Sequence, residues 1–408
     1  MQLQQDRLGK YITTMISAFQ TAPSWNAFIN SMRGPPDIAS GIQHLNHPAK
    51  ELLHRLQRSG VPVLQRSPPW TQEQKHAAMQ RGSHPSANSH TDFLRDEMAD
   101  MVQQRFWIVL PYDLLQHIPA LKLSPLGVIP QRDRRHRVIV DFTFSNVNQN
   151  TVTVAPYEAM QFGRAFDRLL HRIYHANRRF GPVFMIKVDL SDGFYRMPLS
   201  SSHLPSLGVS FPNLPGEPPL VALPLVLPMG WVASPPYFCA LTETAADLAN
   251  QLLHQPVRCP IHPLSIAADH PTEPTLLPRP APPLDMSMYT SVPLLPSLPT
   301  LSHPSRPRAQ VSRNIFQLRT PQQPLAYVDI YVDDFLGLAQ GHPTLRNQVR
   351  SKLLYSIDQV FRPLAPHEHG TARKQPVSMN KLNKGDADRK STRLNSSHLD
   401  LSRMPSSA

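Results

Sequence analysis

Proline limits what this chain can fold into more than any other feature. Proline makes up 45 of the 408 residues, and 16 of the 45 fall within residues 253–325. Because proline lacks a backbone N–H and clashes inside a helix, such a segment resists both helix and sheet. We therefore expect residues 253–325 to be a disordered insertion between two folded parts, a spacer rather than a partner-binding segment.

The rest of the composition is typical of a folded protein. Apolar residues make up 40% of the chain and charged residues 17%, and this length accommodates two or three domains of roughly 100–200 residues. Two cysteines, Cys239 and Cys259, exclude a disulfide framework and a four-cysteine zinc site. The sequence lacks an apolar run of about 18 residues and the apolar core of a signal peptide. We expect an intracellular protein of cytoplasm or nucleus that is not secreted and has no membrane partner.

The formal net charge of +12 favours a polyanionic partner such as nucleic acid. The last residues, however, have another origin. Residues 388–398 (DRKSTRLNSSH) and 402–408 (SRMPSSA) are in-frame translations of two parts of a common sequencing-library adapter. Two in-frame matches argue against a natural basic tail. We expect about 388–408 to be adapter read-through that takes no part in the fold, with the natural chain cut near Ala387.

Hydrophobic spacing predicts both helices and strands after residue 90. Helical spacing occurs in residues 91–106, 157–178, 234–253 and 345–360. Strand patterns occur in residues 183–190, at the two apolar ends of VIPQRDRRHRVIVDF, and in the hairpin-like segment LAYVDIYVDDFLGLAQG. Residues 1–90 hold short amphipathic pieces without recognisable chemistry, and we expect an N-terminal extension that is partly helical or disordered.

The strongest chemical signal is the pair Asp333 and Asp334 inside the apolar hairpin. Adjacent acids at the tip of a buried hairpin are costly unless a cation neutralises them. Asp189 ends the strand FMIKVDL, and Asp192 follows three residues later. If the strand end and the hairpin meet, the acids can hold two Mg²⁺ about 3.5–4 Å apart, which is the arrangement used for in-line phosphoryl transfer. A lone pair of acids would be weak evidence, because such pairs often cap turns.

Four segments in order strengthen this interpretation. The chain between about Phe106 and Ala387 resembles the reverse transcriptases of retrotransposons and retroviruses, interrupted by the proline-rich insertion. The segments are IVDFTFSNVN (139–148), KVDLSDGFYRMPL (187–199), LPMGWVASPPYF (227–238) and YVDDFLGL (331–338). The resemblance implies an α+β right-hand polymerase with an antiparallel palm sheet backed by helices. Residues 91–252 would form the fingers and first part of the palm, and 326–387 the catalytic hairpin and following helix, with the thumb missing.

The resemblance also assigns roles to single residues. Asp189, Asp333 and Asp334 match the metal-binding carboxylates, and Leu190 would offer its backbone carbonyl to a metal. Phe194 matches an aromatic steric gate, which excludes ribonucleotides by a clash with the 2′-hydroxyl. Further substrate contacts match Arg132, Arg137, Asp192, Gly193, Met229, Gly230 and Tyr331.

Two of these matches, Met229 and Arg132, are less close than the others. Many relatives have glutamine where this chain has Met229, so a hydrogen bond to the incoming nucleotide is lost. Arg137 suits a triphosphate through its planar fork of donors. A second basic residue is expected a few positions earlier, and Arg132 competes for that role with Gln131, Arg134 and Arg135.

The resemblance implies RNA-directed DNA polymerase activity with two Mg²⁺, or Mn²⁺, as cofactors. The implied partners are an RNA or DNA template with its primer and deoxynucleoside triphosphates. We expect the 408-residue chain to be inactive or nearly so, because the segments that grip the primer would lie beyond it. Another palm polymerase, such as an RNA-dependent RNA polymerase, is an alternative that Val332 and Phe194 argue against. The second alternative is a non-catalytic remnant that binds nucleic acid through its basic surface.

Overall fold

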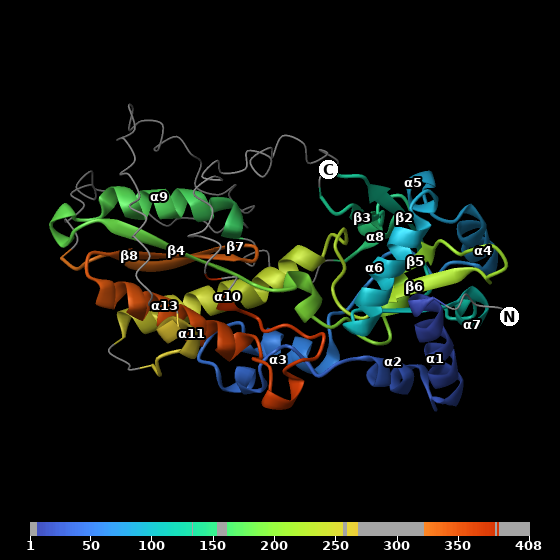
Figure 1. Cartoon of the computed structure of the whole chain (residues 1–408), viewed down its shortest axis with the longest axis horizontal. Helices are drawn as coiled ribbons and strands as arrows, with labels where there is room; N and C mark the ends of the chain where they lie inside the picture. The colour runs from blue at the N-terminus through green and yellow to red at the C-terminus, as the bar shows by residue number, and fades with distance from the viewer. Residues whose placement is uncertain are drawn as a thin grey trace, which may run out of the picture.

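The computed structural model describes residues 6–132, 134–152, 161–255, 259–267, 322–379 and 382. It is an α+β structure with two sheets, one of three strands and one of five (Figure 1). Most of the expected insertion, residues 268–321, and the expected adapter-derived tail, residues 388–408, lie outside the described residues.

The three-stranded sheet contains the segments that carry the predicted acids. Its strands are β4 (Val183–Asp189), β7 (Ala326–Tyr331) and β8 (Asp334–Gln340), in the order β4-β8-β7. Both pairings are antiparallel. The predicted strand at 183–190 and the predicted hairpin are thus confirmed.

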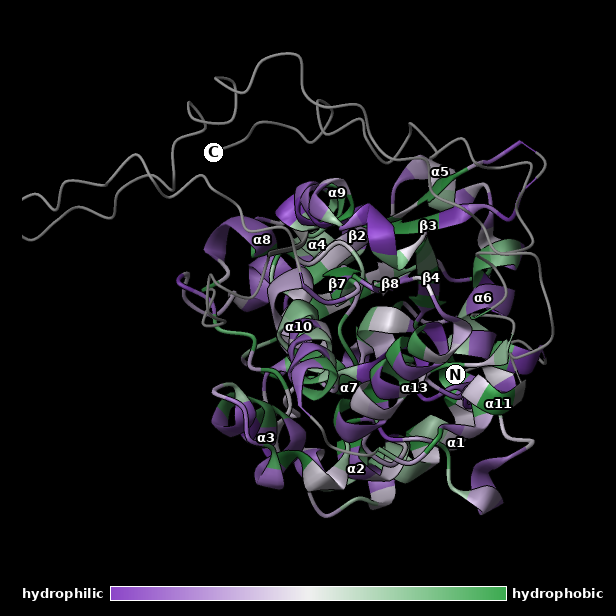
Figure 2. Cartoon of the chain, turned by 90° about the vertical axis from the view of Figure 1, so that its left-hand side faces the viewer, coloured by the Kyte–Doolittle hydropathy of each residue, from purple (hydrophilic) through white to green (hydrophobic). Residues whose placement is uncertain are grey.

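Helices cover both faces of this sheet. Helix α9 (Ala165–His175) lies on one face, and α10 (Ser234–His254) and α13 (Pro343–Val360) lie on the other (Figure 2). Strand alternation explains the two layers. Leu338 and Val183 point toward α9 and pack with it in a small separate cluster. Strand residues that point to the opposite face, such as Val188 and Phe335, belong to the main core.

The second sheet is mixed, with the strand order β1-β6-β5-β2-β3. Strands β2 and β5 pair in parallel, and the other pairs are antiparallel. The arginine-rich segment joins β2 to β3, as predicted. The strands are β1 (Trp107–Pro111), β2 (Leu123–Ile129), β3 (Arg137–Val140), β5 (Gly208–Phe211) and β6 (Leu220–Pro224).

The N-terminal region is an integral part of the fold. Of the two states expected for residues 1–90, the described residues adopt the helical one, and Ile12 and Phe28 are fully buried in the main core. The Trp25 indole N–H donates to the Ser201 carbonyl at 2.7 Å, which ties this region to the rest. Its helices are α1 (Arg7–Thr21), α2 (Trp25–Met32), α3 (Lys50–Ser59), α4 (Gln72–Arg81) and α5 (Pro85–Asn88).

Two predicted helices differ at their ends from the structure, and a helix in the expected insertion was not predicted. Helix α6 (Thr91–Gln103) stops before Phe106, because Arg105 adopts a positive φ of 62°. Helix α9 begins at Ala165 rather than 157, after a 3₁₀ turn, and residues 153–160 lie outside the described part. The insertion also contains a short helix, α11 (Pro263–Ala267), which packs on α13. The other two short helices are α7 (Tyr112–Leu115) and α8 (Val147–Asn150).

Short 3₁₀ turns complete the described structure. They are η1 (Ser40–His44), η2 (Gln161–Arg164), η3 (Arg178–Phe180), η4 (Gly193–Arg196), η5 (Leu204–Leu207) and η7 (Pro366–Glu368). Among the described residues, no helix is both long enough and apolar enough to cross a membrane.

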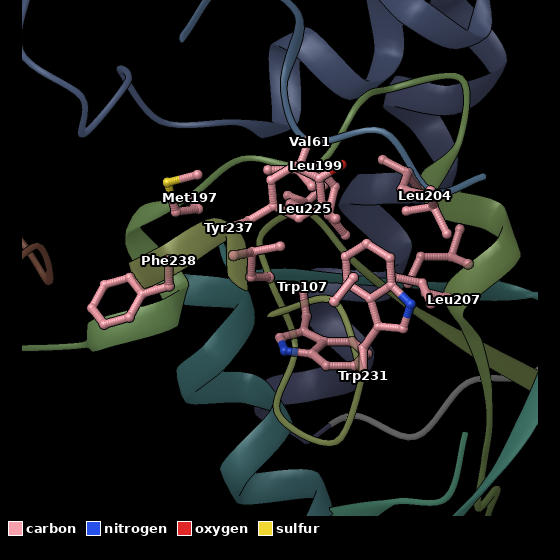
Figure 3. Close-up of a cluster of buried hydrophobic side chains, with 14 of the residues drawn as sticks. Val61, Trp107, Met197, Leu199, Leu204, Leu207, Leu225, Trp231, Tyr237 and Phe238 are labelled. Carbon is pink, nitrogen blue, oxygen red and sulfur yellow. The ribbon is translucent and has the colours of Figure 1, made fainter. Parts of the chain in front are cut away.

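A buried cluster of hydrophobic side chains surrounds the start of α10 and includes Trp107 of β1 (Figure 3). The rings of Trp231 and Tyr237 stack with their centroids 6.4 Å apart. The Trp231 indole N–H donates to the Thr151 hydroxyl at 3.0 Å, so its polar atom is satisfied inside the core. This packing fixes the start of α10 against the five-stranded sheet.

Candidate active site

The acids of the two distant segments meet at one end of the three-stranded sheet. Asp189, the last residue of β4, lies opposite Asp334, the first residue of β8. Directly opposed residues of an antiparallel pair have Cα atoms roughly 4.5–5.5 Å apart. Asp333 immediately precedes Asp334 in the hairpin turn. This end of the sheet faces the five-stranded half of the molecule (Figure 1).

The turn that carries Asp333 is tight and strained. Tyr331 pairs with Asp334, so Val332 and Asp333 alone form the loop. Val332 has φ 58°, a left-handed conformation that a β-branched residue rarely adopts. A positive φ at the first loop position alone is the pattern of a type II′ hairpin turn, which normally has glycine there. The structure around this turn therefore holds Val332 in a conformation that costs about 1–3 kcal/mol.

Asp333 lies in an unfavourable place for a negative charge. Burial, together with the negative charges of Asp334 and Asp189, raises the pKa of its carboxyl to about 6. The three carboxylates are therefore close enough to repel one another. An added cation would relieve this repulsion. Three carboxylates and a backbone carbonyl are oxygen donors of the kind that Mg²⁺ prefers.

A lysine neutralises part of this charge. The Lys187 ammonium lies 2.8 Å from Oδ2 of Asp334. Across the parts of the chain that the structure describes, no group of three or more Asp, Glu, His or Cys side chains is arranged to hold a metal ion. The donor set consists of the oxygen ligands that Mg²⁺ prefers, and Lys187 engages one of its carboxylates.

The turn after Asp189 is fastened directly to the hairpin. The buried Leu190 donates its N–H to the Asp333 carbonyl at 3.2 Å. Asp192 and Gly193 both adopt positive φ, 61° and 27°, and so reverse the chain within two residues. The Asp192 carboxylate bonds to the Lys374 ammonium at 2.9 Å.

Phe194, the predicted steric gate, packs partly against the core. Its ring meets Phe238 edge to face, with centroids 5.0 Å apart. Half-burial fixes the ring orientation, which both a gate and a core residue require. Tyr331, by contrast, is 37% exposed beside the acids, so it is not a core tyrosine.

The segment with Met229 and Gly230 approaches the end of β3. Gly230 has φ 91°, and a Cβ there would lie 2.8 Å from the Val140 carbonyl oxygen, so this position requires glycine. The Asn148 side chain holds the same loop, because its amide donates to the Gly230 carbonyl at 3.0 Å. Met229 is 57% exposed, which leaves an apolar side chain on the surface of this loop.

Arg132 lies in the exposed connection between β2 and β3, and Arg137, also exposed, lies where that connection ends. Arg137 is the first residue of β3 and pairs with Ile129. Arg135, a competitor of Arg132, instead forms ion pairs with Glu97 and Asp100 on α6. That pairing makes Arg135 the weaker candidate for a phosphate contact.

Sequence reasoning missed several charged residues around the site. Lys187 lies two residues before Asp189, and residues two apart in a strand point to the same face. This spacing could have placed Lys187 beside the acids from the sequence alone. Arg196 is buried and donates to the Ser191 carbonyl at 2.6 Å and the Lys374 carbonyl at 2.9 Å. Its third partner, Asp37, lies 3.3 Å away in the N-terminal region, and no sequence pattern marked that contact.

Comparison with protein-family models and with curated proteins found no match to this chain.

Proposed function

We propose that this chain carries the polymerase site of a reverse transcriptase, with β4, β7 and β8 as its palm and the five-stranded sheet as its fingers. The observation that supports this most strongly is the pairing of Asp189 with Asp334 beside Asp333. Helices α10 and α13 behind the sheet are in keeping with a palm. The reaction joins deoxynucleotides to a primer 3′-hydroxyl along an RNA template.

The three aspartates are the residues that would hold Mg²⁺, with the Leu190 carbonyl as a further ligand. Two Mg²⁺ ions, when bound, activate the 3′-hydroxyl and stabilise the leaving pyrophosphate. The strand pairing holds two of the carboxylates in register, and the bond between Leu190 and Asp333 holds the third beside them. This rigid placement is what phosphoryl transfer needs from its protein, because positioning supplies much of the rate.

The surrounding residues have positioning roles in this proposal. Phe194, fixed by Phe238, would lie under the sugar and favour deoxynucleotides. Tyr331 would pack beside the primer terminus, where its ring is exposed. Arg137, with Arg132 as a second candidate, would contact the triphosphate from the fingers.

Primer extension tests the proposal. The 408-residue chain is incubated with a homopolymeric RNA template, a DNA primer, the matching deoxynucleotide, and Mg²⁺ or Mn²⁺. Binding of a fluorescent deoxynucleoside triphosphate in Mn²⁺ is measured in parallel, because binding requires less of the protein than turnover does. Because the 408-residue chain is expected to extend a primer weakly or not at all, nucleotide binding is the deciding measurement. Asp333→Asn is expected to weaken that binding at least about 10-fold and to abolish any extension that the wild type shows.

Asp113→Asn is the matched control, since it makes the same change of charge at an exposed position on α7. It should leave both signals unchanged. Metal-independent binding of nucleic acid that Asp333→Asn does not affect, without nucleotide binding, would contradict the proposal and favour the non-catalytic remnant.

A further inference from the structure

Lys187 occupies a position in the candidate site that the proposed chemistry does not explain. It lies on the same face of β4 as Asp189, opposite Leu336 of β8, and reaches diagonally to Asp334. Its side chain is 38% exposed and that of Asp334 is 30% exposed. The contact is therefore a solvent-accessible ion pair beside the acids, and not a buried structural bridge.

The charge at this end of the sheet is not balanced by this lysine. Three carboxylates at this end of the sheet face one ammonium, which contacts Asp334. The remaining negative charge amounts to about what one divalent cation supplies. An exposed ion pair contributes about 0–1 kcal/mol, so little free energy opposes its replacement.

Lys187 and a ligated cation compete for the same atom. Oδ2 of Asp334 accepts a hydrogen bond from the ammonium at 2.8 Å, and a metal bound at that oxygen would lie next to the ammonium. Like charges at such a separation repel even in a solvent-rich setting. The long flexible stem of lysine allows the ammonium to move away while the backbone stays in place.

We propose that Lys187 is a displaceable counter-ion, which holds Asp334 in a fixed place when no divalent cation is bound and yields it when the cation arrives. The inference rests on the proposed function, because it requires a cation at the three aspartates. It assigns Lys187 a positioning role, exerted through its 2.8 Å contact with Oδ2 of Asp334.

Binding of Mn²⁺ alone tests the idea without any need for turnover. Free Mn²⁺ is measured by electron paramagnetic resonance during titration of the 408-residue chain at fixed ionic strength. Lys187→Met retains much of the stem and removes the charge, and is expected to tighten Mn²⁺ binding roughly 3- to 30-fold. Lys187→Arg keeps the charge and should stay within about 2-fold of the wild type.

Two controls separate the possible explanations. Lys10→Met removes one positive charge from an exposed position on α1, and should leave Mn²⁺ affinity unchanged. Lys187→Gln should shift affinity in the same direction as Lys187→Met, which guards against a packing effect of methionine. The increase in melting temperature caused by a fixed Mn²⁺ concentration should be larger in both Lys187 variants, because tighter binding to the folded state stabilises it more.

The failure of this inference differs from the failure of the proposed function. If Asp333→Asn abolishes Mn²⁺ binding but both neutral Lys187 variants bind Mn²⁺ as the wild type does, or more weakly, Lys187 is not a displaceable counter-ion. If Asp333→Asn leaves Mn²⁺ binding unchanged, the metal site itself is wrong, and the role of Lys187 is refuted with it.

Discussion

The ion pair between Arg168 of α9 and Asp329 of β7 allows a quantitative prediction of the free energy of unfolding. The guanidinium of Arg168 grips the Asp329 carboxylate with two bonds, from Nε at 2.8 Å and from Nη2 at 2.6 Å. Asp329 lies in the middle of β7 and is 3% exposed. The Tyr327 hydroxyl and the Ile330 N–H also donate to it, at 2.8 and 2.9 Å. The same strand leads to the turn with the candidate catalytic acids.

Arg168→Met would leave a buried carboxylate without its cation. Loss of one partner of a buried pair costs about 3–5 kcal/mol. Here the carboxylate keeps two donors and the arginine side chain is 33% exposed, so we expect the free energy of unfolding to fall by about 2–4 kcal/mol. For a domain of this size that corresponds to a melting temperature lower by roughly 5–15 °C.

Urea and thermal unfolding followed by circular dichroism measure this loss. Arg172→Met is the matched control on the same helix, because Arg172 packs over the Tyr327 ring at 4.7 Å and its loss should cost about 0.5–1 kcal/mol. The double variant Arg168→Met/Asp329→Asn should be more stable than Arg168→Met, since the unpaired charge is gone. A loss below about 1 kcal/mol for Arg168→Met, or no recovery in the double variant, would refute the reasoning.

Two further predictions concern acid stability and the hairpin turn. Hydrogen bonds from Arg362 hold the pKa of Glu368 at about 2, below the usual 4.5. The ionised Glu368 therefore stabilises the fold fully above pH 4.5, and this stabilisation is lost as the pH falls toward 2. Glu368→Gln should flatten the pH dependence of the unfolding free energy between these two pH values. Parallel urea titrations of both proteins would show this, and equal slopes would contradict it. Val332→Gly relieves the positive φ of 58° at the cost of chain entropy, whereas Val332→Ala keeps the strain, so the glycine variant should be the more stable of the two by about 1 kcal/mol; a more stable alanine variant would show that the turn is not strained.

Much of the three-stranded sheet was predictable because its signals are local. Period-two alternation and a short loop define the hairpin of β7 and β8, and proline at the first turn marks the start of α10. The convergence of Asp189 with the hairpin acids was predicted from motif order rather than from periodicity. The pairing of Asp189 with Asp334 agrees with that expectation, while the metal ions remain a prediction.

Other parts could not be predicted, because they depend on contacts between distant segments. The helices before residue 90 have weak individual signals and gain stability by packing on the main core. Asp37 shows the same limit on a small scale, since its partners Arg196 and Arg373 are far away in the sequence. Helix α11 was not predicted, because the segment around it is rich in proline. It is held by contacts with α13, among them the 2.9 Å hydrogen bond between the neighbouring His262 and Asp358.

The residues that follow the proline-rich segment enter the three-stranded sheet at the end far from the acids. The chain enters β7 at Ala326, at the end of the strand opposite the hairpin turn. There the buried Gln340 fixes the strand: its side-chain oxygen accepts from the Leu325 N–H at 3.1 Å, and its amide donates to the Asn177 and Gly181 carbonyls at 2.8 Å. A longer connection adds only about 0.6 kcal/mol of closure entropy for each doubling of its length. Because the entry point is clamped and lies a full strand length from Asp333, we predict that the length of that segment can change without moving the acids.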